Sequence, residues 1–340
     1  MFSLDHNRIS HVLRSRILGT GRALPARVVT NDDLATRMDT SDDWIRERTG
    51  IEERRWVTGE SCADLATAAA RDALAAAGLQ PSDIDAIVLA TSTPDHFAPG
   101  VGVFVQRALE IPGIPALDIR TQCSGFVYAL SVADAWIQVG LYRRILVIGA
   151  EVQSTGMDVS SRGRNTAVIF ADGAGAVVLG VSDDPARGIL GFDLHSDGTG
   201  AEKLWLDSPV RYHESMPIDR FDPAVNCLQM DGRDVFRNAV VRMPESVMAV
   251  LAKIGQPLEA LDLLVPHQAN LRISEMVQKT LKLRDAQVVN NIQRYGNTTA
   301  GTIPIALDEA VREGRVQAGD LVVLTAFGSG FLWGSCALRW

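Results

Sequence analysis

A faint internal repeat constrains this chain more than any other feature of its sequence. Four short, mostly apolar segments of the first half have counterparts in the second half, in the same order. The pairs are Arg16–Gly19 with Gly188–Gly191, Ile84–Val88 with Leu261–Val265, Arg144–Ile148 with Asp320–Leu324, and Gly175–Leu179 with Gly334–Leu338. One such pair would arise by chance, because apolar strands look alike. Four pairs in matching order favour a duplicated architecture.

Each half alternates short β-like runs with helical patterns, which predicts an α/β fold. The 340 residues suit two packed halves. We expect an N-terminal extension over residues 1–15, a first half over 16–185 and a second half over 186–340. The expected helices span residues 62–77, 123–139, 234–254, 271–281 and 299–311. Pro244 should break or kink the third of these helices.

Composition and charge exclude several classes of function. The net charge is −8 and no long basic run is present, so nucleic acid is not an expected partner. Residues 1–16 lack the apolar stretch of a signal peptide, and no run of about 18 apolar residues predicts a membrane span. The cysteines form no CxxC pair, so neither a metal site nor a disulfide framework is expected. A reducing, cytoplasmic setting is the default expectation.

Cys123 is a candidate nucleophile because of where it lies in the sequence. It stands in Thr121-Gln122-Cys123-Ser124-Gly125-Phe126, between a predicted strand and a predicted helix. A helix N-terminus offers free N–H groups and partial positive charge, which favour the reactive thiolate. The alternative is a buried cysteine that packs as a small apolar side chain. We interpret the other three cysteines in that way: Cys62, Cys227 and Cys336.

His267 and Asn297 are candidate partners of Cys123. His267 follows the apolar run Leu263–Pro266 and precedes a predicted helix, and ligands of α/β sheets bind at such strand ends. Asn297 lies in Arg294-Tyr295-Gly296-Asn297-Thr298-Thr299, directly before another helix. Taken alone, that asparagine would be interpreted as a turn or capping residue.

A cysteine, a histidine and an asparagine in this order fit two chemistries. One is a papain-like protease: His267 follows Cys123 by 144 positions (267 − 123), within the about 130–150 typical of that class. The C-G-[SA]-C-[WY] motif of those proteases is absent around Cys123. The other is decarboxylative condensation, in which the cysteine carries an acyl group and the two partners stabilise an enolate. That chemistry needs no metal or redox cofactor.

Four segments together resemble the β-ketoacyl-acyl-carrier-protein synthase III family of condensing enzymes. They are TQCSGF around Cys123, VPHQANLR around His267, YGNTTA around Asn297 and FGSGFLWG around Ser329. Residues 39–45, 48–51 and 170–176 also look like family signatures, and the similarity covers about residues 16–340. The resemblance implies a five-layered αβαβα thiolase fold of two similar halves and a homodimer. It also implies acyl-coenzyme A and malonyl-acyl-carrier protein as substrates.

The resemblance also implies a role for each matching residue. Cys123 would be the acylated nucleophile, while His267 and Asn297 would bind the malonyl thioester carbonyl. The backbone N–H groups of Cys123 and Ser329 would form the oxyanion hole. Four residues match the coenzyme A contacts of the family: Thr40, Trp44, Arg48 and Arg164. Arg237 and Arg272 match basic positions that receive acyl-carrier protein, with ordinary surface charge as the alternative for both.

Two departures from the family pattern concern the acyl group. The family commonly places an aromatic residue directly before the proline of the acyl-pocket segment, whereas Ala98 precedes Pro99 here and Phe97 is shifted by one place. Residues 200–225 also look longer than in compact members. Both features predict a medium-chain or bulky acyl group instead of acetyl.

Three alternative functions remain open at this stage. The first keeps the same residues in secondary metabolism, as a starter-condensing enzyme of quinolone or polyketide type. The second is a cysteine hydrolase, and the third is a non-catalytic binding module of the same fold.

Overall fold

Two β-sheets with the same strand order form the framework of the computed structural model, which describes residues 13–206 and 227–340. The first sheet runs β1 (Ser15–Ala23), β7 (Asp172–Val181), β6 (Arg144–Val152), β4 (Ala86–Ala90) and β5 (Ala116–Ile119). The second runs β8 (Gly188–Ser196), β13 (Leu332–Arg339), β12 (Leu321–Gly328) and β11 (Leu263–Pro266). The four sequence pairs fall on equivalent strands of the two sheets. The predicted duplication is therefore confirmed by the topology.

Strand directions match as well. In each sheet the first two strand pairs are antiparallel, and the next pair, β6 with β4 or β12 with β11, is parallel. The first sheet continues with β5, parallel to β4. At the equivalent place in the second sheet, the described residues contain only one parallel bridge, between Leu264 and Val288. The predicted boundary at residues 185 and 186 lies between β7 and β8.

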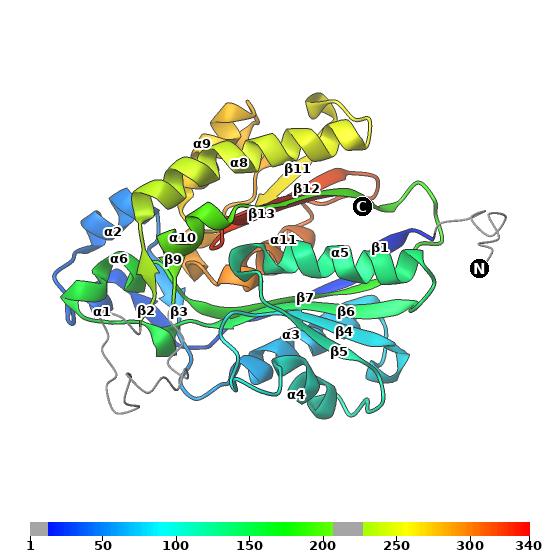
Figure 1. Ribbon diagram of the computed structural model, residues 1–340, viewed down its shortest axis with the longest axis horizontal. Helices are drawn as coiled ribbons and strands as arrows, with labels where there is room; N and C mark the ends of the chain where they lie inside the picture. Colours follow the sequence, from blue (N-terminus) through cyan, green and yellow to red (C-terminus); the bar gives the residue numbers. More distant parts are fainter. Residues whose placement is uncertain (1–12, 207–226) are drawn as a thin grey trace.

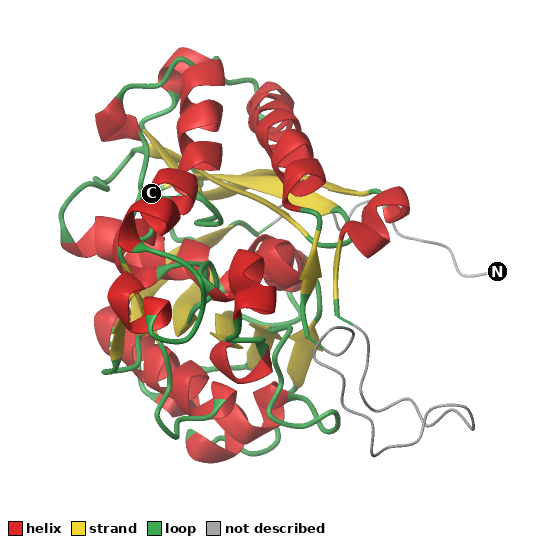
Figure 2. Ribbon diagram, turned by 90° about the vertical axis from the view of Figure 1, so that its left-hand side faces the viewer, coloured by secondary structure: helices red, strands yellow, loops and turns green. Residues whose placement is uncertain are grey.

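Helices and sheets alternate in five layers (Figures 1 and 2). Helices α3 (Cys62–Ala77) and α4 (Val101–Ala108) cover the outer face of the first sheet, while α8 (Gly232–Lys253) and α9 (Leu271–Thr280) cover that of the second. Helices α5 (Gly125–Gln138) and α11 (Thr302–Arg312) lie between the sheets. Their apolar side chains join both sheets in one core, so the two halves are a single packed unit.

The predicted helices match the structure closely, with one correction. The α3 helix spans the predicted range: Ser61 and Asp64 form a capping box, and Gly78 ends the helix at φ +65°. Helix α8, in contrast, continues through Pro244, so the chain does not break there, and the alternative of a kink stays a prediction. Pro244 and the neighbouring Val247 are buried among the residues that face the second sheet. Such packing outweighs the loss of one helical hydrogen bond.

Short elements gather at one end of the two sheets, on the left of Figure 1. They are β2 (Val28–Thr30), α1 (Asn31–Ala35), α2 (Asp42–Thr49), β3 (Glu53–Arg55), α6 (Arg164–Ala167), β9 (Leu204–Trp205), β10 (Gln229–Met230) and α10 (Ile292–Tyr295). The buried Arg54 side chain connects them by donating to Asn31 Oδ1 and to the Val168 carbonyl, both at 2.8 Å. The parallel strands β4, β5 and β11 end nearby, where ligand sites of α/β sheets form.

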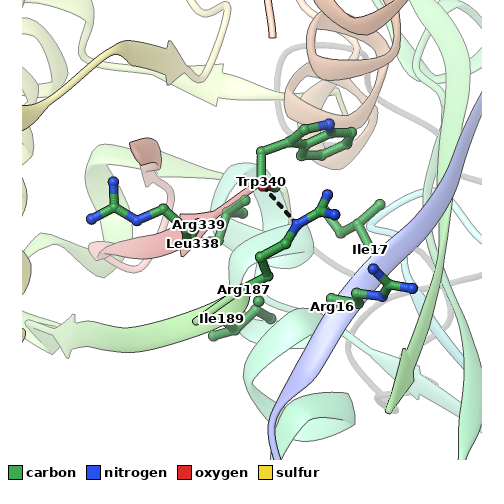
Figure 3. A pocket seen from close by; sticks show the side chains of 8 residues that line it. Arg16, Ile17, Arg187, Ile189, Leu338, Arg339 and Trp340 are labelled. Atoms are coloured by element: carbon green, nitrogen blue, oxygen red, sulfur yellow. Dashed lines mark hydrogen bonds between the residues drawn. The ribbon is translucent and has the colours of Figure 1, made fainter. Parts of the chain in front are cut away.

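A shallow hollow near the C-terminal residue Trp340 lies where the two halves meet (Figure 3). Arg187, just before β8, donates from Nε to the Trp340 carbonyl at 3.0 Å. The other two arginines of the hollow also have partners: Arg16 pairs with Asp183 at 3.0 Å, and Arg339 donates to the Gly319 carbonyl at 3.1 Å. Each of these three contacts lies within one half: the Arg16 pair in the first, and the Arg187 and Arg339 bonds in the second.

Candidate active site

Cys123 lies in a single 3-10 turn, Gln122–Ser124, between β5 and the start of α5. Its side chain is buried. The end of β12 passes so close that a Cβ atom on Gly328 would lie 2.6 Å from the Cys123 Cβ and 3.1 Å from its Sγ. Only glycine fits there. This approach brings the N–H of Ser329 to the Cys123 sulfur, which also has a hydrogen bond from its own N–H.

The protonation state of Cys123 differs from the sequence prediction. Burial, followed by the charge of Glu151, raises the pKa of the Cys123 thiol to about 12. The hydrogen bonds from the Ser329 and Cys123 N–H groups lower the pKa, but they do not offset the burial. The expectation that the start of a helix would favour thiolate is therefore wrong for the free chain, where the neutral thiol is the resting form.

His267 follows β11 directly and is buried. Its Nδ1 lies 2.6 Å from Thr302 Oγ1, and that hydroxyl lies 3.0 Å from the Thr299 carbonyl oxygen. The buried Nε2 has no hydrogen-bond partner within the described residues. Burial lowers the pKa of His267 to about 3, so the ring is neutral near pH 7. The Thr302 hydroxyl has a single hydrogen, which goes either to the Thr299 carbonyl or to Nδ1. In the second case Nε2 carries the ring hydrogen and can donate it.

Asn297 points its amide group at the same cavity. Its Oδ1 accepts a hydrogen bond from the Thr299 N–H at 2.8 Å, so within the described residues the Nδ2 group is the part of the amide that can still donate. Cys123, His267 and Asn297 line one cavity together with Phe327 and Gly328. The structure thus brings together the three residues that were singled out from separate segments, with two neutral donors beside one thiol.

Two further cavities adjoin this middle cavity: the mouth, lined by Trp44 and Arg48, and an inner cavity on the other side of Cys123. The mouth and the middle cavity share lining residues: Ile169, Met230, Gly232, Phe236 and Asn270. The middle cavity shares Cys123, Phe170 and Leu204 with an inner cavity. Sequence reasoning missed Met230 and Phe236 because they carry no reactive group. It also missed Thr302, whose role depends on a contact that only the fold creates.

The predicted coenzyme A contacts gather around Trp44, which lines the mouth. The guanidinium carbons of Arg48 and Arg164 lie 4.4 and 4.5 Å from the centre of the Trp44 ring. Arg164 also donates to the Asp39 carbonyl at 2.6 Å. The Thr40 hydroxyl, next in sequence, is buried and has no hydrogen-bond partner within the described residues. Because Arg164 already lies against Trp44, a flat base could enter between the two only by displacing the guanidinium group.

Arg237 and Arg272 line the same mouth as Trp44 and Arg48. Arg237 forms a salt bridge with Asp234 at 3.5 Å, and the Arg272 guanidinium lies 5.8 Å from the Phe236 ring centre. The mouth is therefore basic although the chain as a whole is acidic.

Phe97 and Ala98, the predicted acyl-pocket residues, lie on the exposed loop between β4 and α4. The Phe97 side chain is 72% exposed, and neither residue is among those that line the inner cavity of this single chain. That cavity is bordered by apolar Leu206 and Leu228, polar Ser92 and Thr93, and cationic Arg120, which sequence reasoning missed. Most of the long segment 200–225 lies outside the described residues, at 207–226.

Family models match both halves of the chain. The model described as 3-oxoacyl-[acyl-carrier-protein (ACP)] synthase III matches residues 117–198, and its C-terminal counterpart matches residues 251–340. A curated relative, beta-ketoacyl-[acyl-carrier-protein] synthase III of Rhodospirillum centenum, is 47% identical over 96% of this chain and 99% of its own length. The chain belongs to the 3-oxoacyl-[acyl-carrier-protein] synthase III family.

Further comparisons agree with membership of this synthase III family. The relative of the same name from Granulibacter bethesdensis is 48% identical, again over 96% of this chain and 99% of its own. The crystal structure of 3-oxoacyl-[acyl-carrier-protein] synthase III from Aquifex aeolicus is similar with a TM-score of 0.88 and 43% identity, covering 96% of this chain and 100% of that one. The predicted family, thiolase-like fold and acyltransferase class are thereby confirmed.

Within 13–206 and 227–340, no group of three or more His, Cys, Asp or Glu side chains is arranged to hold a metal ion. Among the helices of the same residues, none is long and apolar enough to span a bilayer.

Proposed function

We propose that this chain condenses an acyl-coenzyme A primer with malonyl-acyl-carrier protein, the first elongation step of fatty acid synthesis. The observation that carries the proposal is the convergence of two neutral donors, from His267 and Asn297, on the cavity that contains Cys123. The relatives named beta-ketoacyl-[acyl-carrier-protein] synthase III support the same activity.

In the first half-reaction, the Cys123 sulfur bonds to the thioester carbon of acyl-coenzyme A and the bond to the coenzyme A sulfur breaks. The thiol proton of Cys123 ends on the departing coenzyme A thiolate. The N–H groups of Cys123 and Ser329 would donate to the oxygen on which negative charge develops. Because the pKa of the free thiol is raised to about 12, loss of its proton accompanies attack instead of preceding it.

In the second half-reaction, the malonyl thioester oxygen accepts hydrogen bonds from His267 Nε2 and Asn297 Nδ2. Carbon dioxide leaves, and the electrons of the broken carbon–carbon bond form an enolate that both donors stabilise. The enolate carbon attacks the acyl-Cys123 carbonyl and releases the cysteine thiolate, which takes up a proton. A neutral histidine suits this role, and its pKa of about 3 keeps the ring neutral.

The mouth supports the proposed substrate contacts. Thr40, Trp44, Arg48 and Arg164 would bind coenzyme A, with the indole and guanidinium groups as planar surfaces for the base. Arg237 and Arg272 at the same mouth would attract the acidic surface of a carrier protein. No resident cofactor is invoked, since both thioesters are substrates.

We also propose a medium-chain or bulky acyl group and a homodimer in the cytoplasm. The inner cavity beyond Cys123 gives the acyl chain its space. The edge strand β5 and its neighbouring segments expose apolar side chains, with Phe97, Val103 and Leu117 at 72%, 38% and 37% exposure. A second subunit at this edge would cover them. Phe97 and Ala98 would then act on an acyl pocket only across that interface.

Intact-protein mass spectrometry tests the proposed function. The protein is mixed with acyl-coenzyme A thioesters of graded length, and malonyl-acyl-carrier protein is added afterwards. We expect one acyl group on the chain and its discharge as a 3-oxoacyl-carrier-protein product. Discharge by water without a malonyl donor would instead identify a cysteine hydrolase. Loading by acetyl-coenzyme A alone would overturn the proposed acyl length.

A further inference from the structure

Thr299 has an unusual backbone conformation directly beside the catalytic residues. It is a β-branched residue with φ +50°, in the left-handed region that normally suits glycine. Residues of this type are stable there only when their surroundings hold them, and they concentrate at functional sites. Thr299 is also buried, so the contacts that hold it come from the protein interior.

Three groups of Thr299 are used, and two of them orient the donors of the malonyl site. Its N–H donates to Asn297 Oδ1 at 2.8 Å, which turns the Asn297 Nδ2 towards the cavity. Its carbonyl lies 3.0 Å from the Thr302 hydroxyl, which in turn contacts His267 Nδ1 at 2.6 Å. A rotation of the Thr299 backbone would therefore misplace the Asn297 amide directly, and it would also change the surroundings of the Thr302 hydroxyl that contacts His267.

The third group, the Thr299 hydroxyl, connects the donors to the other half of the chain. It accepts a hydrogen bond from Gln153 Nε2 at 2.8 Å. Gln153 follows β6 and also contacts the Ser92 hydroxyl at 3.3 Å. Ser92 donates to the buried Glu151 carboxylate at 3.0 Å, and Glu151 accepts a further bond from the Ala300 N–H, the residue after Thr299.

Close packing keeps this chain of hydrogen bonds in place. A Cβ atom on Gly149 of β6 would lie 2.2 Å from the Ala300 carbonyl oxygen, so the strand directly contacts the turn Thr299–Gly301. The layers of β6 and α11, which this turn precedes, are adjacent in Figure 1. The end of β6 is thus the support against which Thr299 is fixed.

We propose that Gln153 is a positioning residue: from the first half of the chain it holds Thr299 in its strained conformation and so orients the two donors for the malonyl thioester. Gln153 does not contact the reacting atoms in this arrangement. The inference rests on the proposed function and deepens it, because it assigns the geometry of one half-reaction to a residue of the opposite half.

The test compares the two half-reactions in Gln153→Met, which keeps the length of the side chain but removes its amide. We expect condensation with malonyl-acyl-carrier protein to fall on the order of 10²-fold in kcat/KM, as small misplacements of donors cost. Gln153 and Thr299 also line the inner cavity proposed for the acyl group, so acylation of Cys123 is measured alongside, and condensation should fall at least about tenfold more than acylation. Gln317→Met, whose amide donates to the Gly314 carbonyl far from the site, is the matched control.

A second variant distinguishes positioning from general destabilisation. Glycine adopts positive φ without support, so Thr299→Gly introduced into Gln153→Met should recover at least about tenfold of the lost condensation. Equal losses in acylation and condensation, or no recovery by Thr299→Gly, would overturn the proposal.

A readout that needs no turnover keeps the inference separate from the proposed function. The ¹⁵N chemical shifts of the His267 ring report its hydrogen bonding in the free protein. They should change in Gln153→Met and stay unchanged in Gln317→Met. If the wild-type chain fails to condense but these shifts change as expected, the proposed function falls and the positioning link remains. Unchanged shifts in Gln153→Met would refute the link.

Discussion

The two halves of this molecule share one sheet topology but contribute different chemistry to the site. In the proposed mechanism the first half supplies Cys123, which carries the acyl group, and the same half contains the buried Glu151, whose pKa is raised to about 7. The second half supplies His267 and Asn297, donors that stay neutral near pH 7. If the repeat of Ile84 with Leu261 is continued along the strand, His267 corresponds to the buried Ala90. The duplicated framework thus brings equivalent strand ends to one site. Different residues at those ends give the two halves different roles in the proposed reaction.

The same comparison applies to β6 and β12. When Arg144 is matched with Asp320 and the match is continued, Glu151 corresponds to Phe327 and Gln153 to Ser329. Ser329 donates its N–H to Cys123 of the first half, and Gln153 donates to the hydroxyl of Thr299 in the second half, which under our proposal orients the donors there. Each strand end therefore supports the chemistry located on the opposite half. Because each strand end contacts residues of the opposite half, neither half would form a complete site alone.

The largest expected effect comes from removing the proposed nucleophile of the first half. Cys123→Ala removes the only group that can carry the acyl chain in the proposed mechanism, so acyl loading should disappear. Intact mass after incubation with acyl-coenzyme A measures the loss. Cys336→Ala is the control, because that cysteine is buried in the core between the sheets. Persistent acyl mass on Cys123→Ala would assign the nucleophile elsewhere.

The next largest effect comes from removing either of the proposed donors of the second half. His267→Ala and Asn297→Ala should each lower condensation by about 10²–10³-fold, the cost of losing one preorganised donor. Acyl loading should continue in both variants, because the proposed oxyanion donors are backbone N–H groups. Single-turnover loading and carbon dioxide release from malonyl-acyl-carrier protein measure the two steps separately. A matching loss of loading would show that the two halves do not divide the reaction.

Gly328 tests how closely the two halves must approach at the nucleophile. Gly328→Ala places a methyl group 2.6 Å from the Cys123 Cβ, so either the strand end or the cysteine must move. We expect slower acyl loading by about tenfold and a loss of about 1–3 kcal/mol in the free energy of unfolding. Time-resolved acyl-loading assays measure the loading rate, and urea denaturation measures the free energy of unfolding. Gly198→Ala is the control, because a Cβ atom there meets no atom within 4 Å. Gly140→Ala is unsuitable, because Gly140 has a φ of +73°.

The sequence predicts those features of the molecule that depend on neighbouring residues in the chain, and it fails where contacts between distant segments decide. Local signals were sufficient for α3, where Ser61 and Gly78 mark both ends. The repeat predicted the two equivalent sheets, and strand-end positions singled out Cys123 and His267. A break at Pro244 does not occur, because burial against a sheet, a tertiary effect, outweighs the local rule.

The pKa of Cys123 and the roles of Thr302 and Gln153 depend on contacts between distant segments. The Gln153 contact with Thr299 joins residues 146 positions apart. No local pattern contains such information. For the same reason Phe97 and Ala98 stay predictions, because one chain does not bring them to the inner cavity.

Glu151 has a buried carboxyl group where its counterpart in the second half, Phe327, has an apolar ring. Burial raises the pKa of Glu151 from 4.5 to about 7. The folded state therefore binds this proton more tightly than the unfolded state. The contribution of this proton to the free energy of unfolding is complete below pH 4.5. It is lost as the pH rises through 7, which lowers the free energy of unfolding by about 3 kcal/mol. Glu151→Gln removes this term, so urea denaturation from pH 5 to 8 should show a weaker decline than in the wild type. Parallel curves would contradict the buried charge.

The smallest expected effect concerns the mouth, where the two halves contribute to one basic surface. Arg164 of the first half stacks on Trp44 at 4.5 Å, whereas Arg272 of the second half lies over Phe236 at 5.8 Å. If Arg164 exchanges Trp44 for the coenzyme A base, Arg164→Ala loses one exposed cation–π contact, worth about 0.5–1 kcal/mol. The KM for acyl-coenzyme A should rise about two- to fivefold, with little change for malonyl-acyl-carrier protein. Arg272→Ala should show the reverse preference, since a carrier protein binds through surface charge and its affinity depends on salt. Equal effects of both variants on both substrates would mean that the mouth attracts charge in general and does not discriminate between the two donors.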